Sequence, residues 1–334
     1  MSDGTIAFDR SAQIFNSSIA TWAVSAAWDV GIFRALTEAD QIDIPWYAKN
    51  EEMHEPSLRA LLRALSYADV VEVDFDRVTR GATFEEFSRS KGLLQWLTKG
   101  YGSLFQRMGD VVYEKHRTGD FIQRDSSAVS IACRDANDVF MDAAFTAVLE
   151  TLDFSVAADL GCGSGERLIQ LAKRDPSLKC VGIDIAAGAI EVGTKAVAEN
   201  GLQDRVTLVQ GDARKLGDYP EFADVELMAS FLMGHDFWPR ENCVELFRQF
   251  RKQLPNLKHF LLCDTHRHPD DATSDLPLFT MGFETAHALM GQYIPTRSEW
   301  ESVFEESGWK CVRQHVYSTP ANTVIFQLER ADGE

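Results

Sequence analysis

A glycine-rich loop, Asp159-Leu-Gly-Cys-Gly-Ser-Gly165, is the segment whose residue types most clearly suggest chemistry. The loop follows the apolar stretch 156–160 and precedes residues 166–174, whose apolar spacing predicts a helix. A strand, a glycine loop and a helix in this order bring backbone N–H groups and a helix N-terminus against a ligand. Glycine is needed because a side chain would block that approach. We therefore predict ligand contacts from Asp159, Gly161, Gly163 and Gly165.

The glycine spacing favours S-adenosylmethionine (AdoMet) over a dinucleotide. A dinucleotide loop has the pattern G-x-G-x-x-G, but the third glycine comes one place early here and Glu166 takes its position. AdoMet has no phosphate, so the loop need only lie under its methionine part while acidic groups bind the rest. The alternative is that these residues are only turn glycines and N-capping aspartates, which are common between strands and helices.

Two further motifs follow the next two predicted strands, 180–185 and 206–210, in the order that AdoMet binding requires. Asp184 and Ile185 end the first of them, where a carboxylate suits the ribose hydroxyls. Gly211-Asp212-Ala213 follows the second, where the Asp212 carboxylate can accept a hydrogen bond from the adenine amino group. Three motifs in this order predict an AdoMet site more strongly than the glycine loop alone.

A histidine and an aspartate, His235 and Asp236, come shortly after the fourth predicted strand, 225–229. This strand ends at the edge of the sheet where an acceptor must lie to meet the methyl group. The position of His235 resembles that of the general base in plant-type small-molecule O-methyltransferases, which carry a His-Asp-Trp motif there. The resemblance implies an N-terminal dimerisation domain and a catalytic domain of the same fold family.

A closer resemblance, to the bacterial 2-oxoacid C-methyltransferases, covers nearly the whole chain. That family is typified by enzymes that methylate phenylpyruvate at its β-carbon in peptide-antibiotic pathways. The stretches that carry the resemblance are Ile14-Phe-Asn-Ser17, Trp96-Leu97, Arg117-Thr-Gly119, Gln123-Arg-Asp125, Gly163-Ser-Gly-Glu-Arg-Leu-Ile-Gln170, Gly234-His-Asp-Phe-Trp-Pro-Arg-Glu-Asn-Cys243 and Met290-Gly291.

In this second family two histidines hold a non-haem iron, and the motifs that carry them fall on His235 and His287. Two imidazoles leave coordination positions open for water and for a bidentate 2-oxo carboxylate, although imidazole also suits other divalent metals. The C3–H of a 2-oxoacid is a weak acid, and a metal that chelates the oxo and carboxylate oxygens stabilises the enolate that attacks the methyl group. The family pattern has no histidines at His266 and His268, so we expect these to be loop residues.

Four more residues are candidates for the acceptor site. Asp236 is expected to orient a ligand, to bind a metal-bound water or to accept the C3 proton, and Arg124 to meet the substrate carboxylate with its guanidinium. The alternatives without a role in catalysis are that Asp236 caps the N-terminus of a helix and that Arg124 forms an ordinary ion pair. Trp96 and Tyr101 suit an apolar side-chain pocket. Tyr101 stands where the resemblance implies a small residue, which argues against phenylpyruvate itself. A 2-oxoacid with an aryl, a branched aliphatic or a guanidino side chain would fit the motifs.

The elements that position these residues predict two domains. Apolar residues recur at helical spacing over 9–68, and Val70-Val-Glu-Val-Asp-Phe-Asp-Arg-Val78 alternates like a hairpin before another helix near Phe84. We predict a mainly helical, winged-helix-like domain for dimerisation and substrate covering over residues 1–105. Residues 106–334 alternate strands with helices, 260–263 being the fifth strand, and predict a Rossmann-like α/β class I methyltransferase domain with a parallel sheet.

Composition excludes several classes of partner. The formal net charge is −18, and the first 90 residues hold 8 Lys and Arg against 15 Asp and Glu, so nucleic acid is not an expected partner. Six scattered cysteines and the absence of a signal peptide or long apolar run predict a cytoplasmic protein that does not bind membranes. A homodimer is expected from the apolar helix around residues 14–30 and from the family.

We therefore predict an AdoMet-dependent enzyme that methylates C3 of a 2-oxoacid. The main alternative is a metal-free O-methyltransferase in which His235 removes a hydroxyl proton. A regulator that binds AdoMet or DNA without catalysis is disfavoured by the acidic N-terminal half and by the His-Asp pair.

Overall fold

The computed structural model describes residues 9–119, 121–268, 276–317 and 322–331. By its contacts the chain divides into two compact units, residues 1–142 and 143–334. The domain boundary expected after residue 105 lies within α7 (Gly102–Gln106), inside the first unit. No helix among the described residues is both long enough and apolar enough to span a lipid bilayer.

The first unit begins with helices and a small antiparallel sheet of order β1-β3-β2. The hairpin predicted over 70–78 is confirmed as β2 and β3, which pair from Val71 with Arg80 to Asp74 with Arg77. A third strand, β1, joins β3 and was not predicted, because three residues are too short to show alternation. The elements up to this hairpin are α1 (Asp9–Asp29), α2 (Ile32–Glu38), β1 (Gln41–Asp43), α3 (Ile44–Asn50), α4 (Glu55–Tyr67), β2 (Val71–Asp74) and β3 (Arg77–Arg80).

The rest of the first unit is helical. Residues Trp96–Gly100 form a π-helical turn that continues α6, an irregularity often found at functional sites. The helices after the hairpin are α5 (Phe84–Arg89), α6 (Lys91–Gln95), η1 (Trp96–Gly100), α7, α8 (Met108–Val111), η2 (Glu114–His116) and α9 (Ser126–Phe140).

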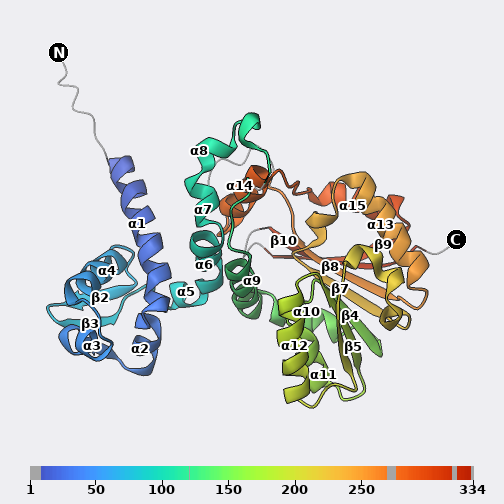
Figure 1. Cartoon of the computed structure of the whole chain (residues 1–334), viewed down its shortest axis with the longest axis horizontal. Helices are drawn as coiled ribbons and strands as arrows, with labels where there is room; N and C mark the ends of the chain where they lie inside the picture. The colour runs from blue at the N-terminus through green and yellow to red at the C-terminus, as the bar shows by residue number, and fades with distance from the viewer. Residues whose placement is uncertain (1–8, 120, 269–275, 318–321, 332–334) are drawn as a thin grey trace. The chain divides into compact units, whose positions relative to one another are not determined.

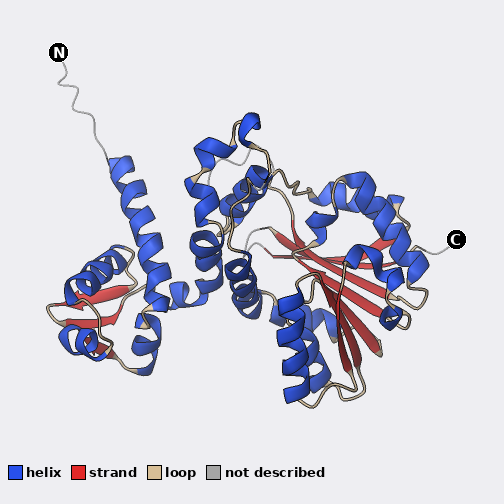
Figure 2. Cartoon of the chain, viewed as in Figure 1, coloured by secondary structure: helices blue, strands red, loops and turns tan. Residues whose placement is uncertain are grey.

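The second unit is built on a seven-stranded sheet of order β6-β5-β4-β7-β8-β10-β9 (Figures 1 and 2). The five strands predicted from the sequence are present, each within two residues of its expected position, and pair in parallel. Their bounds are β4 (Val156–Leu160), β5 (Lys179–Asp184), β6 (Val206–Gln210), β7 (Leu227–Phe231) and β8 (His259–Thr265).

Two C-terminal strands, β9 (Trp309–Tyr317) and β10 (Thr323–Arg330), make the sheet mixed rather than parallel. β10 lies antiparallel to β8, with Thr323 opposite Thr265, and β9 covers its other side. The five predicted strands do form a parallel sheet, and the two antiparallel strands added at its edge were not predicted. The Rossmann-like class is confirmed, since β4 to β8 alternate with helices in the expected way.

The helical segments before, between and after these strands are α10 (Asp142–Leu149), α11 (Glu166–Arg174), α12 (Ala187–Glu199), η3 (Ala213–Asp218), η4 (Pro220–Phe222), η5 (Gly234–Phe237), α13 (Arg240–Gln253), α14 (Thr280–Met290) and α15 (Arg297–Glu306). The core between the sheet and α13 and α15 is rich in fully buried aromatic residues, including Phe247, Phe260 and Trp300. Burying such rings is the main favourable term in assembling this layer.

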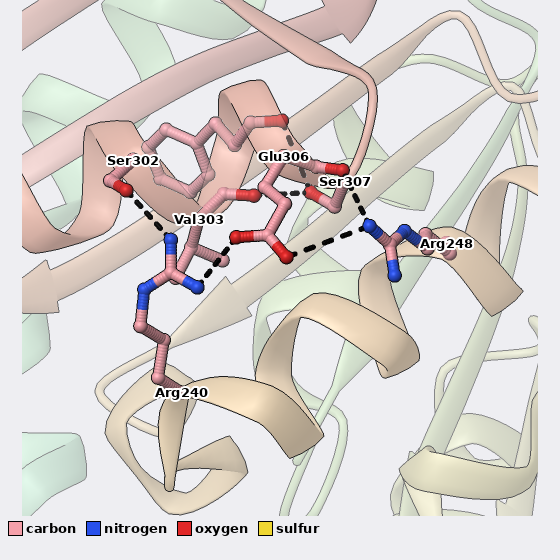
Figure 3. Close-up of polar contacts among 7 residues, drawn as sticks. Arg240, Arg248, Ser302, Val303, Glu306 and Ser307 are labelled. Atoms are coloured by element: carbon pink, nitrogen blue, oxygen red, sulfur yellow. Dashed lines mark hydrogen bonds and ion pairs between the residues drawn. The ribbon is translucent and has the colours of Figure 1, made fainter.

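Ion pairs at the surface join α13 to α15 (Figure 3). The Glu306 carboxylate accepts from Arg240 Nη1 at 2.6 Å and lies 3.7 Å from Arg248 Nη2, while Arg240 Nη2 donates to Ser302 Oγ at 2.7 Å. Exposed pairs of this kind contribute little each, about 0–1 kcal/mol. The aromatic core, more than this network, therefore fixes α13 and α15 in place.

Candidate active site

The glycine-rich loop connects β4 to α11 and turns through left-handed backbone conformations. Gly161 and Gly163 have φ of 71° and 56°, which other residues adopt only with strain. A Cβ at Gly161 would lie 2.6 Å from Met233 Sδ, whereas a Cβ at Gly163 would meet nothing within 4 Å. Gly161 is thus needed for packing, and Gly163 leaves space beside the loop for a ligand. Gly165, with φ of 72°, caps the start of α11.

Most backbone N–H groups of this loop are already bonded within the protein. Those of Gly161 and Cys162 donate to the Ile183 carbonyl at 2.9 and 3.1 Å, and that of Gly165 donates to the Cys162 carbonyl at 2.8 Å. The Gly163 N–H donates to Asp184 Oδ2 at 2.8 Å. A phosphate-binding loop would instead leave several N–H groups free for the anion, so this geometry suits a ligand without phosphate.

Asp184 and Ile185 lie at the end of β5, beside the loop. Asp184 Oδ1 also accepts from the Ala186 N–H at 2.8 Å, so this carboxylate holds the loop and the start of α12 together. The Ile185 side chain is 72% exposed directly after a buried strand. An exposed apolar side chain and a carboxylate at one strand end suit the apolar and hydroxyl parts of a nucleoside.

The third motif lies at the end of β6. Gly211 is required by Tyr219, whose hydroxyl would be 2.4 Å from a Cβ at that position. Asp212 caps η3, which begins at Ala213, and its carboxylate accepts from Arg214 Nε and Nη2 at 2.9 Å each. The side-chain hydrogen bonds from Arg214 hold the pKa of Asp212 below its usual range. Asp212 is therefore ionised at neutral pH and able to accept a further donor.

Asp159, the first residue of the loop motif, is 2% exposed at the end of β4. Arg167 Nη1 donates to its Oδ2 at 3.2 Å. Burial raises the pKa of Asp159 despite the attraction of this arginine. Its carboxylate thus faces the interior beneath the loop, and its contact to Arg167 ties β4 to α11.

His235 is buried in η5, just after β7, and is held by Asp264 at the end of β8. Asp264 Oδ1 accepts from His235 Nδ1 at 2.8 Å, and Asp264 Oδ2 accepts from the His235 backbone N–H at 2.7 Å. Burial lowers the pKa of His235, but the charge and hydrogen bond of Asp264, with a smaller contribution from Asp236, outweigh it and raise the pKa above its ordinary value. With Nδ1 directed to a carboxylate, Nε2 is the nitrogen that carries the lone pair.

His287 comes from α14 and lies against His235. Their ring centroids are 4.9 Å apart and the rings are nearly perpendicular, at 88°. Each side chain is 4% exposed. His287 Nδ1 lies 2.7 Å from the Phe283 carbonyl one helical turn earlier, so Nε2 again carries the lone pair. The structure thus brings together the two histidines that the family resemblance indicated, 52 positions apart in the chain.

Asp264 is a functional residue that the sequence reasoning missed. It is fully buried, and its Oδ1 accepts a second hydrogen bond, from the Thr265 N–H at 2.8 Å. The signal for it in the sequence is a carboxylate next to the last position of an otherwise apolar strand. His266 and His268 lie in the irregular segment after β8, as expected for loop residues.

Asp236 is exposed, unlike its neighbour His235, and the side-chain amide of Gln292 donates to its Oδ1. Gln292 follows α14, and its backbone N–H donates to the His287 carbonyl at 2.8 Å. The Gln292 side chain therefore links the segment that carries His235 to the helix that carries His287. Asp236 lies inside η5, whose N-cap position is Met233.

The other predicted substrate residues form a cluster of their own in the first unit. The rings of Trp96 and Tyr101 lie 4.1 Å apart between centroids, and both side chains are almost fully buried. Arg124 Nη1 donates to the Tyr101 hydroxyl at 2.8 Å, with its guanidinium over the Tyr101 ring. Trp96, Tyr101 and Arg124, which were all predicted to contact substrate, thus lie together in the first unit, whereas His235 and His287 lie together in the second.

The arrangement at the ends of β7 and β8 has two chemical capabilities. An imidazole oriented by a buried carboxylate can act as a general base, because the carboxylate stabilises the imidazolium that forms. Two imidazoles whose Nδ1 atoms are both engaged can instead bind one metal ion through their Nε2 atoms. Among the described residues, no group of three or more His, Cys, Asp or Glu side chains is placed to hold a metal.

Comparisons with known proteins identify the catalytic unit. Residues 157–256, which include the glycine loop and His235, match a family model described as a methyltransferase domain. The chain is 40% identical over 330 residues to the methyltransferase ungE′ of Aspergillus campestris (strain IBT 28561), covering 96% of each chain. It is also 26% identical over 335 residues to the indolepyruvate C-methyltransferase of Streptomyces griseus, covering 97% of this chain and 95% of the relative.

Solved structures share the fold over the full length. The mitomycin 7-O-methyltransferase MmcR superposes with a TM-score of 0.71 at 17% identity, covering 97% of both chains. At that identity the likeness shows the fold alone, with its N-terminal helical region and its mixed Rossmann-like sheet. The family itself is shown by the fungal relative, and the chain therefore belongs to the AdoMet-dependent methyltransferases.

Proposed function

We propose that this methyltransferase transfers the methyl group of AdoMet to C3 of a 2-oxoacid. The observation that carries the proposal is the pair of buried, facing imidazoles of His235 and His287, each with its Nδ1 directed at an acceptor. A full-length relative at 26% identity is named for C-methylation of indolepyruvate, which is itself a 2-oxoacid. The side chain of the 2-oxoacid that this enzyme methylates is aryl, branched aliphatic or guanidino.

His235 and His287 are the residues that would hold a divalent metal, which we propose to be non-haem iron. Asp264 and the Phe283 carbonyl fix the tautomer of the two rings, as carboxylates and carbonyls do for metal-bound histidines elsewhere. Two protein ligands leave room for both oxygens of a 2-oxo carboxylate. When bound, the metal supplies Lewis acidity toward those two oxygens.

Residues of the chain would remove the proton from C3 and bind the substrate. Asp236, whose carboxylate is exposed and held by Gln292, accepts the proton from C3. The electron pair left on C3 attacks the sulfonium methyl in line, the S–CH₃ bond breaks, and S-adenosylhomocysteine leaves. Arg124 is our proposed partner for the substrate carboxylate, because its planar guanidinium matches a carboxylate, and Trp96 and Tyr101 are proposed to meet the substrate side chain.

O-methylation without a metal is the second candidate, and the Asp264–His235 pair favours it. The raised pKa of His235, which Asp264 causes against the effect of burial, makes this imidazole a better base for a hydroxyl proton. His287 has no part in that mechanism, so the two functions differ in what its loss does.

Metal analysis and turnover together test the proposal. We would measure bound metals in the enzyme and in His235→Ala and His287→Ala, with the exposed His54→Ala as control, and assay each with 2-oxoacids and phenols by mass detection of methylated product. The proposal expects iron that is lost in both site variants and C-methylation that fails with it. A metal-free enzyme that methylates a phenol, and in which His287→Ala keeps most activity, would establish O-methylation instead.

We also propose that the enzyme is a homodimer. Helix α1 exposes large apolar side chains in the single chain, with Ile14, Phe15, Ile19 and Trp22 between 47% and 66% exposed. Contiguous exposed apolar surface of this kind usually marks an interface. Light scattering of the enzyme and of Phe15→Glu checks this: a dimer that dissociates in the variant supports the proposal, and a monomeric enzyme refutes it.

A further inference from the structure

A largely buried arginine, Arg167, lies beside the cofactor loop and takes no part in the acceptor chemistry above. It is the second residue of α11, and its side chain is 18% exposed. Its guanidinium carbon lies 3.6 Å from the centroid of the Phe231 ring at the end of β7. Its Nη1 donates to Asp159 at the end of β4. The guanidinium therefore bridges the ends of the two central strands, next to the loop.

The contact to Asp159 does not explain the whole guanidinium. Structural arginine–carboxylate pairs are typically bidentate with distances of about 2.7–2.9 Å, whereas this pair has one hydrogen bond at 3.2 Å. Arg167 Nε is buried and has no hydrogen-bond partner among the described residues. A guanidinium held by a single long hydrogen bond keeps donor capacity for a second anionic partner, which indicates that it is kept for a ligand.

The ligand that belongs here has one anionic group for such a cation. AdoMet carries a sulfonium, an ammonium and an α-carboxylate at its methionine end. The N–H groups of Gly161, Cys162, Gly163 and Gly165 already donate within the protein, so they do not supply donors to that carboxylate. A side-chain cation beside the loop supplies what these four N–H groups do not, and a planar guanidinium matches a carboxylate in shape and charge.

We propose that Arg167 binds the α-carboxylate of AdoMet. Phe231 lies under the flat face of the guanidinium and Asp159 accepts from its Nη1, so that Nη2 is the donor left for the ligand. Phe231 is the last residue of β7, and His235 follows it by four residues in η5. The inference rests on AdoMet dependence alone and holds whichever acceptor is methylated.

Calorimetric binding of two ligands tests this without turnover. AdoMet and decarboxylated AdoMet differ only in the carboxylate, so Arg167→Gln should raise the Kd for AdoMet by about 10- to 100-fold, as expected for a lost charged hydrogen bond. The Kd for decarboxylated AdoMet should change less than about threefold. Arg174→Gln, on the exposed end of the same helix in a pair with Glu150, should change neither Kd.

Two further variants guard against misfolding. Arg167→Lys keeps the charge but not the planar guanidinium, so it should weaken the binding of AdoMet less than Arg167→Gln does and leave the binding of decarboxylated AdoMet unchanged. The double variant Asp159→Asn/Arg167→Gln leaves no unpaired buried carboxylate and should show the same loss for AdoMet alone. Equal loss for both ligands in all three variants would make Arg167 a structural partner of Asp159, and unchanged affinity for AdoMet would equally overturn the proposal.

Discussion

Replacing Asp264 by asparagine separates the orientation of His235 from the size of the side chain that orients it. The carboxylate of Asp264 accepts three hydrogen bonds, two from His235 and one from the Thr265 N–H, at 2.7–2.8 Å. An asparagine of the same shape has one oxygen and one NH₂ group. Whichever way it is turned, the NH₂ group faces at least one N–H donor, and a hydrogen bond is replaced by repulsion.

The structure sets the expected size of the effect. Asp264 is fully buried, so no water can replace the lost partner. An unsatisfied buried donor costs about 1–3 kcal/mol, and we expect the free energy of unfolding of Asp264→Asn to fall by that amount. The His235 ring is then free to turn or to change tautomer, and loss of such an orienting partner lowers activity about 10- to 100-fold.

Two measurements check this on the same samples. Urea unfolding gives the free energy of unfolding, and mass-detected methyl transfer gives kcat/KM, with the exposed Asp224→Asn as the matched control. AdoMet affinity should stay within about twofold, since Asp264 lies at the acceptor side. A variant that keeps kcat/KM within twofold of the parent would refute the role of Asp264, as would a loss that appears in AdoMet binding instead.

Three other predictions concern the sheet, the loop and the acceptor side. The Glu226 carboxylate pairs with the ammonium of Lys258, just before β8, and accepts a hydrogen bond from the Ser155 backbone N–H, just before β4. These contacts hold the pKa of Glu226 below its ordinary value. A carboxylate with a lowered pKa stabilises the folded state at a pH above its pKa in the unfolded chain, and this stabilisation is lost as the pH falls through its pKa in the folded state. In urea melts, the free energy of unfolding of Glu226→Gln should therefore be about 1 kcal/mol below that of the parent at pH 7, and the difference should shrink toward pH 3. Gly193→Ala would place a Cβ 2.4 Å from the Ser164 carbonyl oxygen of the glycine-rich loop and should weaken AdoMet binding measured by calorimetry. Gly188→Ala on the same helix meets nothing within 4 Å and should stabilise the protein by up to about 1 kcal/mol in thermal melts. Gln292→Ala should lower kcat more than it changes the KM for AdoMet, because it removes the donor that holds Asp236; an unchanged kcat would show that this link is not needed.

The sequence predicted the elements whose signals are local. The strand over 156–160, the glycine loop and the helix over 166–174 appear at those positions because apolar runs and glycines act within a few residues. β9 and β10 were missed, because an antiparallel addition to a parallel sheet depends on pairing with β8 and leaves no local signal. Asp264 was missed for the same kind of reason: its partner His235 lies 29 positions earlier, across β7 and β8.

His287 separates the two chemistries that the site allows. The Asp264–His235 pair alone serves a general base as well as a metal ligand, so its geometry does not decide between them. A general base acting alone needs no second imidazole, whereas here a second buried ring lies 4.9 Å from the first. The Phe283 carbonyl directs the Nδ1 of His287, so its Nε2 carries the lone pair that a metal ion shared with His235 would use. The presence of this second, separately oriented histidine is therefore the physical reason to measure metal before substrate.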